Sequence, residues 1–237
     1  MAEFILVHGA FHGAWCWREV VPRLQARGHH AVAIDLPGHG ADRSTLQTIA
    51  LSDYVARIVE AVEASSRPPI LVGHSMGIIS QVELPPAQIR ARIYLSGLLP
   101  PNGASMMQLV GGFDPGYLEQ LEWAPDRRTA RLSATGLRDF FYSCCPAGVA
   151  EAAYPLLTPE PAAPYDTAFS MDSPSFARIP SYYIESLRDR IMPLSMQREM
   201  CAPLPWAGVY SLDTDHAAFF SVPDELAAIL DTIALRP

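Results

Sequence analysis

Six short apolar runs, separated by segments with helical periodicity, limit most strongly what this chain of 237 residues can fold into. The runs are residues 4–7, 30–35, 69–73, 91–97, 181–186 and 208–213. Between several of them apolar residues recur every three or four positions, which is typical of an amphipathic helix. The clearest helical stripes are residues 17–24, 51–62 and 226–233. This alternation predicts an α/β fold whose mostly parallel six-stranded sheet has helices on both faces.

The alternation stops between about residues 100 and 178, where Pro, Gly and Ala are frequent. A structureless loop of that length would be unusual inside a compact domain. The composition does not change enough to indicate an independent unit. We therefore expect residues 1–237 to form a single domain, with a lid inserted at about residues 100–178.

The segment Gly73-His74-Ser75-Met76-Gly77 is a GxSxG motif that joins a predicted strand to a predicted helix. A sharp strand-to-helix turn would hold the serine hydroxyl out above the sheet, and glycines on either side leave room for strand and helix to approach each other. The start of the helix would add a free N–H group and the positive end of its dipole. In this context the motif predicts that Ser75 is a catalytic nucleophile.

A serine hydroxyl needs a base to take its proton, and that base needs a partner to orient it. Only His216 lies downstream of Ser75, in a loop after the last predicted strand. Asp189 follows the preceding strand, so its carboxylate can reach the histidine loop at the carboxyl edge of the sheet. We predict a Ser75, His216 and Asp189 triad. The alternatives are a structural histidine and an ion pair of Asp189 with Arg188 or Arg190.

Hydrolysis also needs N–H groups to bind the oxyanion of the tetrahedral intermediate. The residue after the nucleophile, Met76, is expected to supply one backbone N–H, and Ala10 in the loop after the first strand is expected to supply the other. Phe11, Trp123 and Tyr154 are candidate lining residues of an apolar substrate pocket. Each of these aromatic residues could instead belong to the core.

Composition excludes several classes of function. The net charge of −8 argues against nucleic acid or an anionic membrane as the main partner. All 17 basic residues are arginine, which rules out Schiff-base and P-loop lysines.

The four cysteines have no metal-ligand spacing, so we expect no metal and no cofactor. Without a signal peptide or a membrane-length apolar run, we expect a cytoplasmic protein, with a homodimer as an open alternative.

Six segments resemble those of a known family. They are "LVHGAFHGAWCW", "AIDLPGHG", "LVGHSMG", "YLSGLLPPNGAS", "RDRIMPLSMQREM" and "DTDHAAFFSVPDEL". They resemble the small α/β-hydrolases that include plant methylesterases, hydroxynitrile lyases and bacterial carboxylesterases, and the likeness looks closest to the bacterial esterases. In that family the triad acid lies eight residues before a glutamine, a spacing that Asp189 and Gln197 match. The resemblance also implies Ala10 and Met76 as oxyanion donors.

Two departures from the family pattern matter. Hydroxynitrile lyases carry a threonine in place of Gly9 and a lysine in place of Ala217. This chain therefore lacks two residues of the lyase pattern, including the lysine that would hold a cyanide leaving group. Relatives usually have GxSxGG, whereas this chain continues Gly77-Ile78 and reaches Pro85 about four residues early, which is close to one helical turn. We expect a shortened helix after the strand-to-helix turn at Ser75, which we call the elbow.

The sequence thus predicts a serine carboxylesterase that acts on small apolar esters through an acyl-enzyme. One alternative keeps the triad but cleaves a lactone, an amide, a carbamate or a C–C bond. Another is a ligand receptor of the same fold with negligible turnover.

Overall fold

The computed structural model describes residues 1–170 and 178–236 and contains a main sheet of six parallel strands in the order β2-β1-β3-β4-β8-β9. The strands are β1 (Glu3–Val7), β2 (His30–Ile34), β3 (Ile70–His74), β4 (Ala91–Leu95), β8 (Ser181–Ser186) and β9 (Gly208–Leu212). The predicted six-stranded, parallel sheet of an α/β fold is confirmed. β1, β3, β4 and β8 are buried along their whole length because both faces of the sheet are covered.

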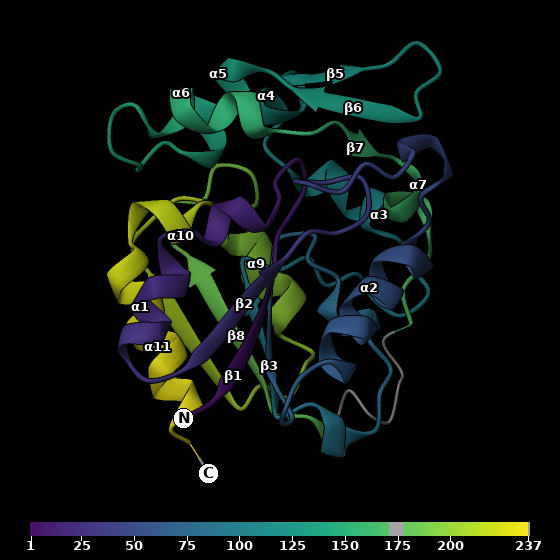
Figure 1. Cartoon of the computed structure of the whole chain (residues 1–237). Helices are drawn as coiled ribbons and strands as arrows, with labels where there is room; N and C mark the ends of the chain where they lie inside the picture. The colour runs from purple at the N-terminus through teal and green to yellow at the C-terminus, as the bar shows by residue number, and fades with distance from the viewer. Residues whose placement is uncertain (171–177, 237) are drawn as a thin grey trace.

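Helices cover the sheet as the periodicity predicted. α1 (Val20–Ala26) and α11 (Pro223–Ala234) contact each other on the left of the sheet in Figure 1, and α2 (Leu51–Glu63) lies on the right. α9 (Leu194–Cys201) contacts β8. The buried residues of α2 are Leu51, Tyr54, Ile58 and Val62. Their spacing of three or four places them on one face, so the same stripe that predicted the helix packs it onto the sheet.

The helix expected after Gly77 is absent, so that prediction is wrong. Between β3 and β4 the chain forms only two short 3₁₀ turns, η3 (Ile79–Gln81) and η4 (Pro86–Gln88). Only seven residues separate Gly77 from Pro85. Proline disfavours helical backbone in the residue before it, and a helix of so few residues is marginal. The dipole of a helix therefore does not contribute beside Ser75.

The described residues 96–170 lie between β4 and β8 and form an insertion. Figure 1 shows it above the carboxyl ends of the parallel strands, while both termini lie at the opposite end of the sheet. Its core is a small antiparallel sheet, β5-β6-β7. Its strands and helices are α3 (Met106–Leu109), α4 (Pro115–Leu118), β5 (Leu121–Trp123), β6 (Thr129–Leu132), α5 (Ala134–Gly136), α6 (Val149–Ala153), β7 (Glu160–Pro161) and α7 (Ala163–Asp166).

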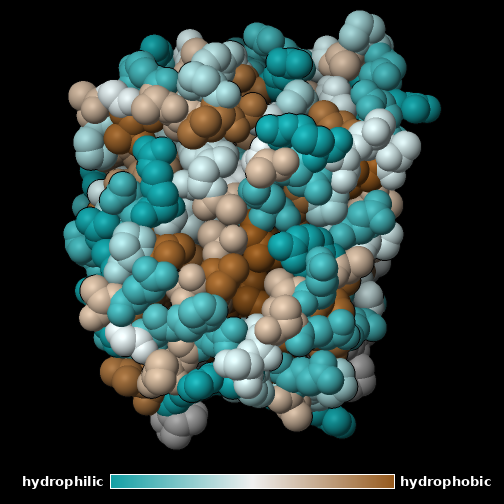
Figure 2. All heavy atoms as spheres, viewed as in Figure 1, coloured by the Kyte–Doolittle hydropathy of each residue, from teal (hydrophilic) through white to brown (hydrophobic). Residues whose placement is uncertain are grey.

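Short helical turns complete the described chain. They are η1 (Ala14–Trp17), η2 (Leu46–Thr48), η5 (Val110–Gly112), η6 (Leu137–Phe141), η7 (Tyr154–Leu156) and α10 (Ala218–Ser221). In the space-filling view of Figure 2, hydrophobic side chains gather near the centre of the face, in the region where Figure 1 shows β2, whose Val32 is exposed. Across residues 1–170 and 178–236, none of the helices has the length and apolar character that spanning a bilayer requires.

Candidate active site

Ser75 occupies a strained turn directly after β3. Its φ is 53°, in the left-handed region that residues other than glycine seldom adopt. Two backbone hydrogen bonds maintain this conformation. The Ser75 amide donates to the Leu95 carbonyl at 3.0 Å, and the Ser75 carbonyl accepts from the Leu98 amide at 2.9 Å. Observed strain of this kind concentrates at functional sites because the surrounding structure must maintain it.

Three glycines let the backbone close around Ser75. A Cβ added at Gly73 would collide with the Gly77 carbonyl oxygen, and one at Gly77 would lie 2.8 Å from the His74 amide nitrogen. A Cβ at Gly9 would lie 2.9 Å from the Ser75 Cβ. The loop after β1 therefore packs directly against the serine, as an oxyanion loop must.

We expect Gly73→Ala to destabilise the protein strongly, because the new methyl group would collide with backbone rather than with a flexible side chain. Overpacking of this severity costs about 3 kcal/mol, equivalent to a melting temperature about 6–12 °C lower for a chain of this size. The matched control is Gly111→Ala, where an added Cβ meets nothing within 4 Å. Thermal unfolding followed by circular dichroism measures both. Equal melting temperatures would contradict the close approach at the elbow.

The structure brings two of the predicted triad residues into contact. His216 Nδ1 lies 2.6 Å from Asp189 Oδ2, and both side chains are fully buried. The other carboxylate oxygen, Asp189 Oδ1, accepts from the amides of Ile191 at 2.8 Å and Met192 at 3.0 Å. Because these bonds fix the carboxylate, they also fix the plane of the imidazole.

The alternative partners of Asp189 are engaged elsewhere. Arg188 Nε lies 2.9 Å from Asp213 Oδ1, and Arg190 donates to the Asp139 carbonyl oxygen at 2.9 Å. Within the described residues, the second nitrogen of the catalytic candidate, His216 Nε2, is buried and has no hydrogen-bond partner. With Nδ1–H directed to Asp189, Nε2 carries a lone pair that can accept a proton.

His74 also holds the His216 loop, a role that sequence reasoning missed. Its Nε2–H donates to the His216 carbonyl oxygen at 2.8 Å, and the two rings lie 4.6 Å apart. Burial lowers the pKa of His74, so the ring is neutral and can carry this single donor. On the other side of His216, Asp215 accepts from the amides of Cys144 and Ala217. In the sequence, the only feature that pointed to the contact of His74 with the His216 loop was the presence of a histidine inside the GxSxG motif.

The two predicted oxyanion donors are both available. In the described part of the chain, neither the Ala10 amide nor the Met76 amide donates to a protein acceptor, although both residues are buried. Buried amides normally have partners, so two unpaired ones near a strained serine are notable. The next residue, Phe11, has a φ of 64° and is itself in the left-handed region.

Two buried histidines hold the Ala10 loop. The carbonyl oxygen of Ala10 accepts from His12 Nδ1 at 2.7 Å, while His12 Nε2 accepts from the Tyr142 hydroxyl at 2.8 Å. His8 Nδ1 donates to the Gly9 carbonyl oxygen at 2.8 Å, and its Nε2 accepts from the Leu36 amide at 3.0 Å. Each ring thus donates once and accepts once, which requires the neutral form.

This arrangement predicts lower stability at acidic pH. Burial lowers the pKa of His12 from 6.5 to about 4. Between these values the unfolded chain binds a proton that the folded protein does not, so the free energy of unfolding falls as pH drops through this window. At pH 5.0 the loss from His12 is about 2 kcal/mol.

Urea unfolding of the wild type and of His12→Asn at pH 7.5 and pH 5.0 measures this effect. Asparagine keeps a donor for the Ala10 carbonyl but cannot titrate. We expect the wild type to lose about 2 kcal/mol more than the variant over this range. The comparison is needed because His39 contributes with the opposite sign: burial lowers its pKa, but the Glu160 carboxylate, the Pro37 carbonyl and Asp35 together raise it by more. The same pH dependence in both proteins would contradict the assignment.

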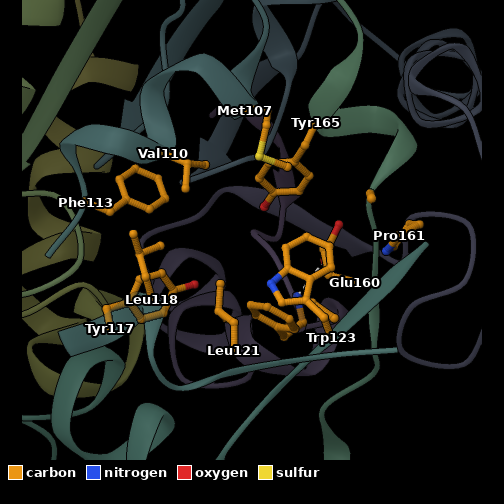
Figure 3. A pocket seen from close by; sticks show the side chains of 13 residues that line it. Met107, Val110, Phe113, Tyr117, Leu118, Leu121, Trp123, Glu160, Pro161 and Tyr165 are labelled. Carbon is orange, nitrogen blue, oxygen red and sulfur yellow. Dashed lines mark hydrogen bonds between the residues drawn. The ribbon is translucent and has the colours of Figure 1, made fainter. Parts of the chain in front are cut away.

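An aromatic-lined cavity of about 60 Å³ lies within the insertion and borders Phe11, the residue after Ala10. Figure 3 shows Phe113, Tyr117, Trp123 and Tyr165 around it. The full lining is Phe11, Met107, Val110, Phe113, Tyr117, Leu118, Leu121, Trp123, Ala130, Glu160, Pro161, Ala162 and Tyr165. It therefore includes two of the predicted pocket residues. By the measure that about 10–15 Å³ holds one water, the cavity admits a group of only a few heavy atoms.

The third predicted pocket residue, Tyr154, is not part of this cavity. Its side chain lies on the surface of the insertion, with 42% of the residue exposed. Ser75 and His216 do not line the cavity either. Phe141 connects the two regions, because its ring lies 6.4 Å from that of Phe11 and 5.1 Å from that of His216. Among the described residues, no group of three or more His, Cys, Asp or Glu side chains could hold a metal ion.

Comparisons with known proteins agree with this architecture. A chloroplastic protein of Arabidopsis thaliana that carries a methylesterase name is 31% identical over 98% of this chain, which spans 64% of that protein. Esterase PIR7B of Oryza sativa subsp. japonica is 30% identical, with 98% and 95% of the two chains covered. The crystal structure of a pyrethroid hydrolase from Sphingobium faniae JZ-2 superposes with a TM-score of 0.88 at 27% identity, covering 100% of this chain and 98% of that one.

The match to a family extends over almost the whole sequence. Residues 4–229 match the alpha/beta hydrolase family, and this range contains the elbow, the Asp189–His216 pair and the insertion. The chain belongs to the α/β-hydrolase family.

Proposed function

We propose that this protein is a serine carboxylesterase in which Ser75 is the nucleophile, His216 the general base and Asp189 the residue that orients it. One observation carries the proposal. The buried His216 ring places Nδ1 2.6 Å from a carboxylate fixed by two amides, while the buried Nε2 has no partner in the described chain. An imidazole held in this way is suited to take a proton from a hydroxyl.

The reaction follows from these roles. The Ser75 Oγ attacks the ester carbonyl carbon as its proton passes to His216 Nε2, and Asp189 stabilises the resulting imidazolium. The carbonyl oxygen becomes an oxyanion that accepts from the Ala10 and Met76 amides, each worth about 3 kcal/mol in the transition state. The intermediate collapses as His216 protonates the leaving alcohol. Water then attacks the acyl-enzyme by the same route and releases the acid.

The cavity supports a small apolar ester as substrate. Its walls are mostly aromatic and aliphatic, and Phe141 links it to His216, which favours an apolar ester although neither Ser75 nor His216 lines the cavity. The names of the similar proteins support hydrolysis: two are named as a methylesterase and an esterase, and the third is named as a pyrethroid hydrolase. Lactones, amides, carbamates and C–C bonds present a carbonyl to the same triad and form the competing substrate classes.

A ligand receptor with negligible turnover is the second candidate, because a specific observation favours it. The segment behind the elbow contains two 3₁₀ turns in place of a helix, so Met76 lacks the aligned peptide dipoles of a helix N-terminus. The two amide donors at Ala10 and Met76 and the His216–Asp189 pair favour the enzyme over the receptor.

Rapid mixing with p-nitrophenyl acetate separates the two candidates. An acyl-enzyme mechanism predicts a burst of p-nitrophenolate equal to the enzyme concentration when deacylation is the slower step. A fluorophosphonate probe should also modify one residue, which peptide mass spectrometry should locate at Ser75. Absence of both turnover and labelling, with a folded protein, would favour the receptor. Labelling at another serine would reject the assigned nucleophile.

A further inference from the structure

Glu160 is a buried carboxylate that reaches from the insertion to the Ala10 loop. It lies on β7, is 5% exposed, and its Oε2 accepts from the Phe11 amide at 2.9 Å. The two residues are 149 positions apart in sequence. Figure 3 labels Glu160 among the side chains that line the cavity. A carboxylate in such an apolar setting is costly unless it is paired and hydrogen-bonded.

The partner of this carboxylate is His39, in the segment after β2. His39 Nε2 lies 2.9 Å from Glu160 Oε2, and its Nδ1 lies 3.1 Å from the Pro37 carbonyl oxygen. Burial lowers the pKa of His39, but the Glu160 carboxylate, the Pro37 carbonyl and Asp35 together raise it by more, which favours the imidazolium. With both ring nitrogens protonated, each contact becomes a donated hydrogen bond. The pair therefore retains the charge of Glu160 in the interior.

The insertion holds the Phe11 backbone through both of its polar groups, the amide and the carbonyl. Besides the bond from its amide to Glu160, the Phe11 carbonyl oxygen accepts from the Thr158 amide at 2.9 Å. Phe11 has a φ of 64°, which an aromatic residue adopts only under external constraint. The peptide between Ala10 and Phe11 carries the Ala10 carbonyl and the Phe11 amide, so holding Phe11 fixes this peptide and restricts the Ala10 backbone torsions that orient the Ala10 N–H relative to it.

We propose that Glu160, supported by His39, is a positioning residue of the oxyanion hole: it holds the Phe11 backbone so that the Ala10 amide faces the reacting carbonyl. The insertion then contributes to the chemical step as well as to the enclosure of substrate. This inference rests on the proposed esterase function. A separate role of Glu160 in binding substrate is the competing explanation, because the residue also lines the cavity.

The two roles differ in which kinetic constant changes. An oxyanion donor stabilises the transition state and not the bound ester, so its misplacement lowers kcat and leaves KM unchanged. A wall residue of the cavity changes KM. An aryl trifluoromethyl ketone provides a second readout, because Ser75 adds to it and forms a stable oxyanion in the same hole. Its affinity should follow kcat.

The test compares Glu160→Ala, Glu160→Gln and the wild type, with Glu122→Gln as the matched control. Glu122 is exposed on β5 of the same insertion and does not line the cavity. Titration with a p-nitrophenyl phosphonate counts active sites, so that kcat refers to folded enzyme. We expect Glu160→Ala to lower kcat and the affinity for the ketone about 30- to 100-fold, approaching the loss of one oxyanion donor.

Glutamine should rescue most of this loss, because its amide oxygen can still accept from the Phe11 amide. We expect kcat of Glu160→Gln to be about 5-fold below the wild type, with KM unchanged and Glu122→Gln equal to the wild type. If Glu160→Ala does not fold, the test rests on kcat and KM of the Glu160→Gln variant alone.

Three outcomes would overturn the inference. They are a wild-type kcat in both Glu160 variants, a change confined to KM, and a loss of activity that matches the loss of titratable sites. If instead the wild type hydrolyses no ester, the proposed function fails together with the inference. Failure of the inference alone leaves the wild type active, so the two results are distinguishable.

Discussion

Replacing Ser75 with alanine is expected to lower kcat for hydrolysis of an unactivated ester about 10⁶-fold, the loss typical of removing a triad nucleophile. The methyl group cannot form the acyl-enzyme, so only substrate binding and the two backbone donors remain. His216→Gln should have an effect of the same size. The double variant should be no slower than either single variant, because the two groups act as one unit.

Steady-state kinetics with a methyl ester and a p-nitrophenyl ester measure these losses. Ser52→Ala is the matched control, since Ser52 is exposed on α2. Circular dichroism should show all variants folded. Multiplicative losses in the double variant would show that Ser75 and His216 act independently, and activity near wild type in Ser75→Ala would exclude it as the nucleophile.

Asp189→Asn is expected to lower kcat about 10⁴-fold with little change in KM. The asparagine amide group can donate to His216 Nδ1, which then favours the tautomer with its proton on Nε2. That tautomer cannot accept a proton from Ser75, and the charge that stabilises the imidazolium is also lost. The oxygen fixed by the Ile191 and Met192 amides can be retained, so the loop itself should stay folded.

Asp213→Asn provides the control for this substitution. Asp213 lies in the loop of His216, but its side chain is 74% exposed and pairs with Arg188. We expect its kcat to match the wild type, because exposed ion pairs contribute little. Kinetics at pH 8 compare the two variants. A loss of less than tenfold in Asp189→Asn, or a large loss in Asp213→Asn, would assign the orienting carboxylate to a different residue.

The fold was predictable because its signals are local. A run such as Ile70–His74 is apolar at nearly every position since it is covered on both faces, and that property is visible in the sequence. The stripe of α2 is equally local. The helix behind Ser75 was expected to be shortened by the early Pro85, but it is absent. The seven residues between Gly77 and Pro85 are too few for a stable helix, so this local signal was read correctly in direction and underestimated in size.

The candidate triad was predictable to the extent that topology constrains it. The carboxyl ends of parallel strands lie at one edge, so residues that follow strands, such as Asp189 and His216, come together there. The structure places these two in contact at 2.6 Å, and the catalytic role of the set remains a prediction for the variants above.

By itself the sequence determined the layered α/β architecture and the short set of residues able to perform acyl transfer. Only the tertiary structure decided that Tyr154 lies at the surface, that His74 donates to the His216 loop, and that Glu160 reaches Phe11. Periodicity and turn chemistry depend on neighbours within a few positions. A contact between side chains more than a hundred residues apart depends on how the insertion packs over the sheet, and no local pattern encodes that packing.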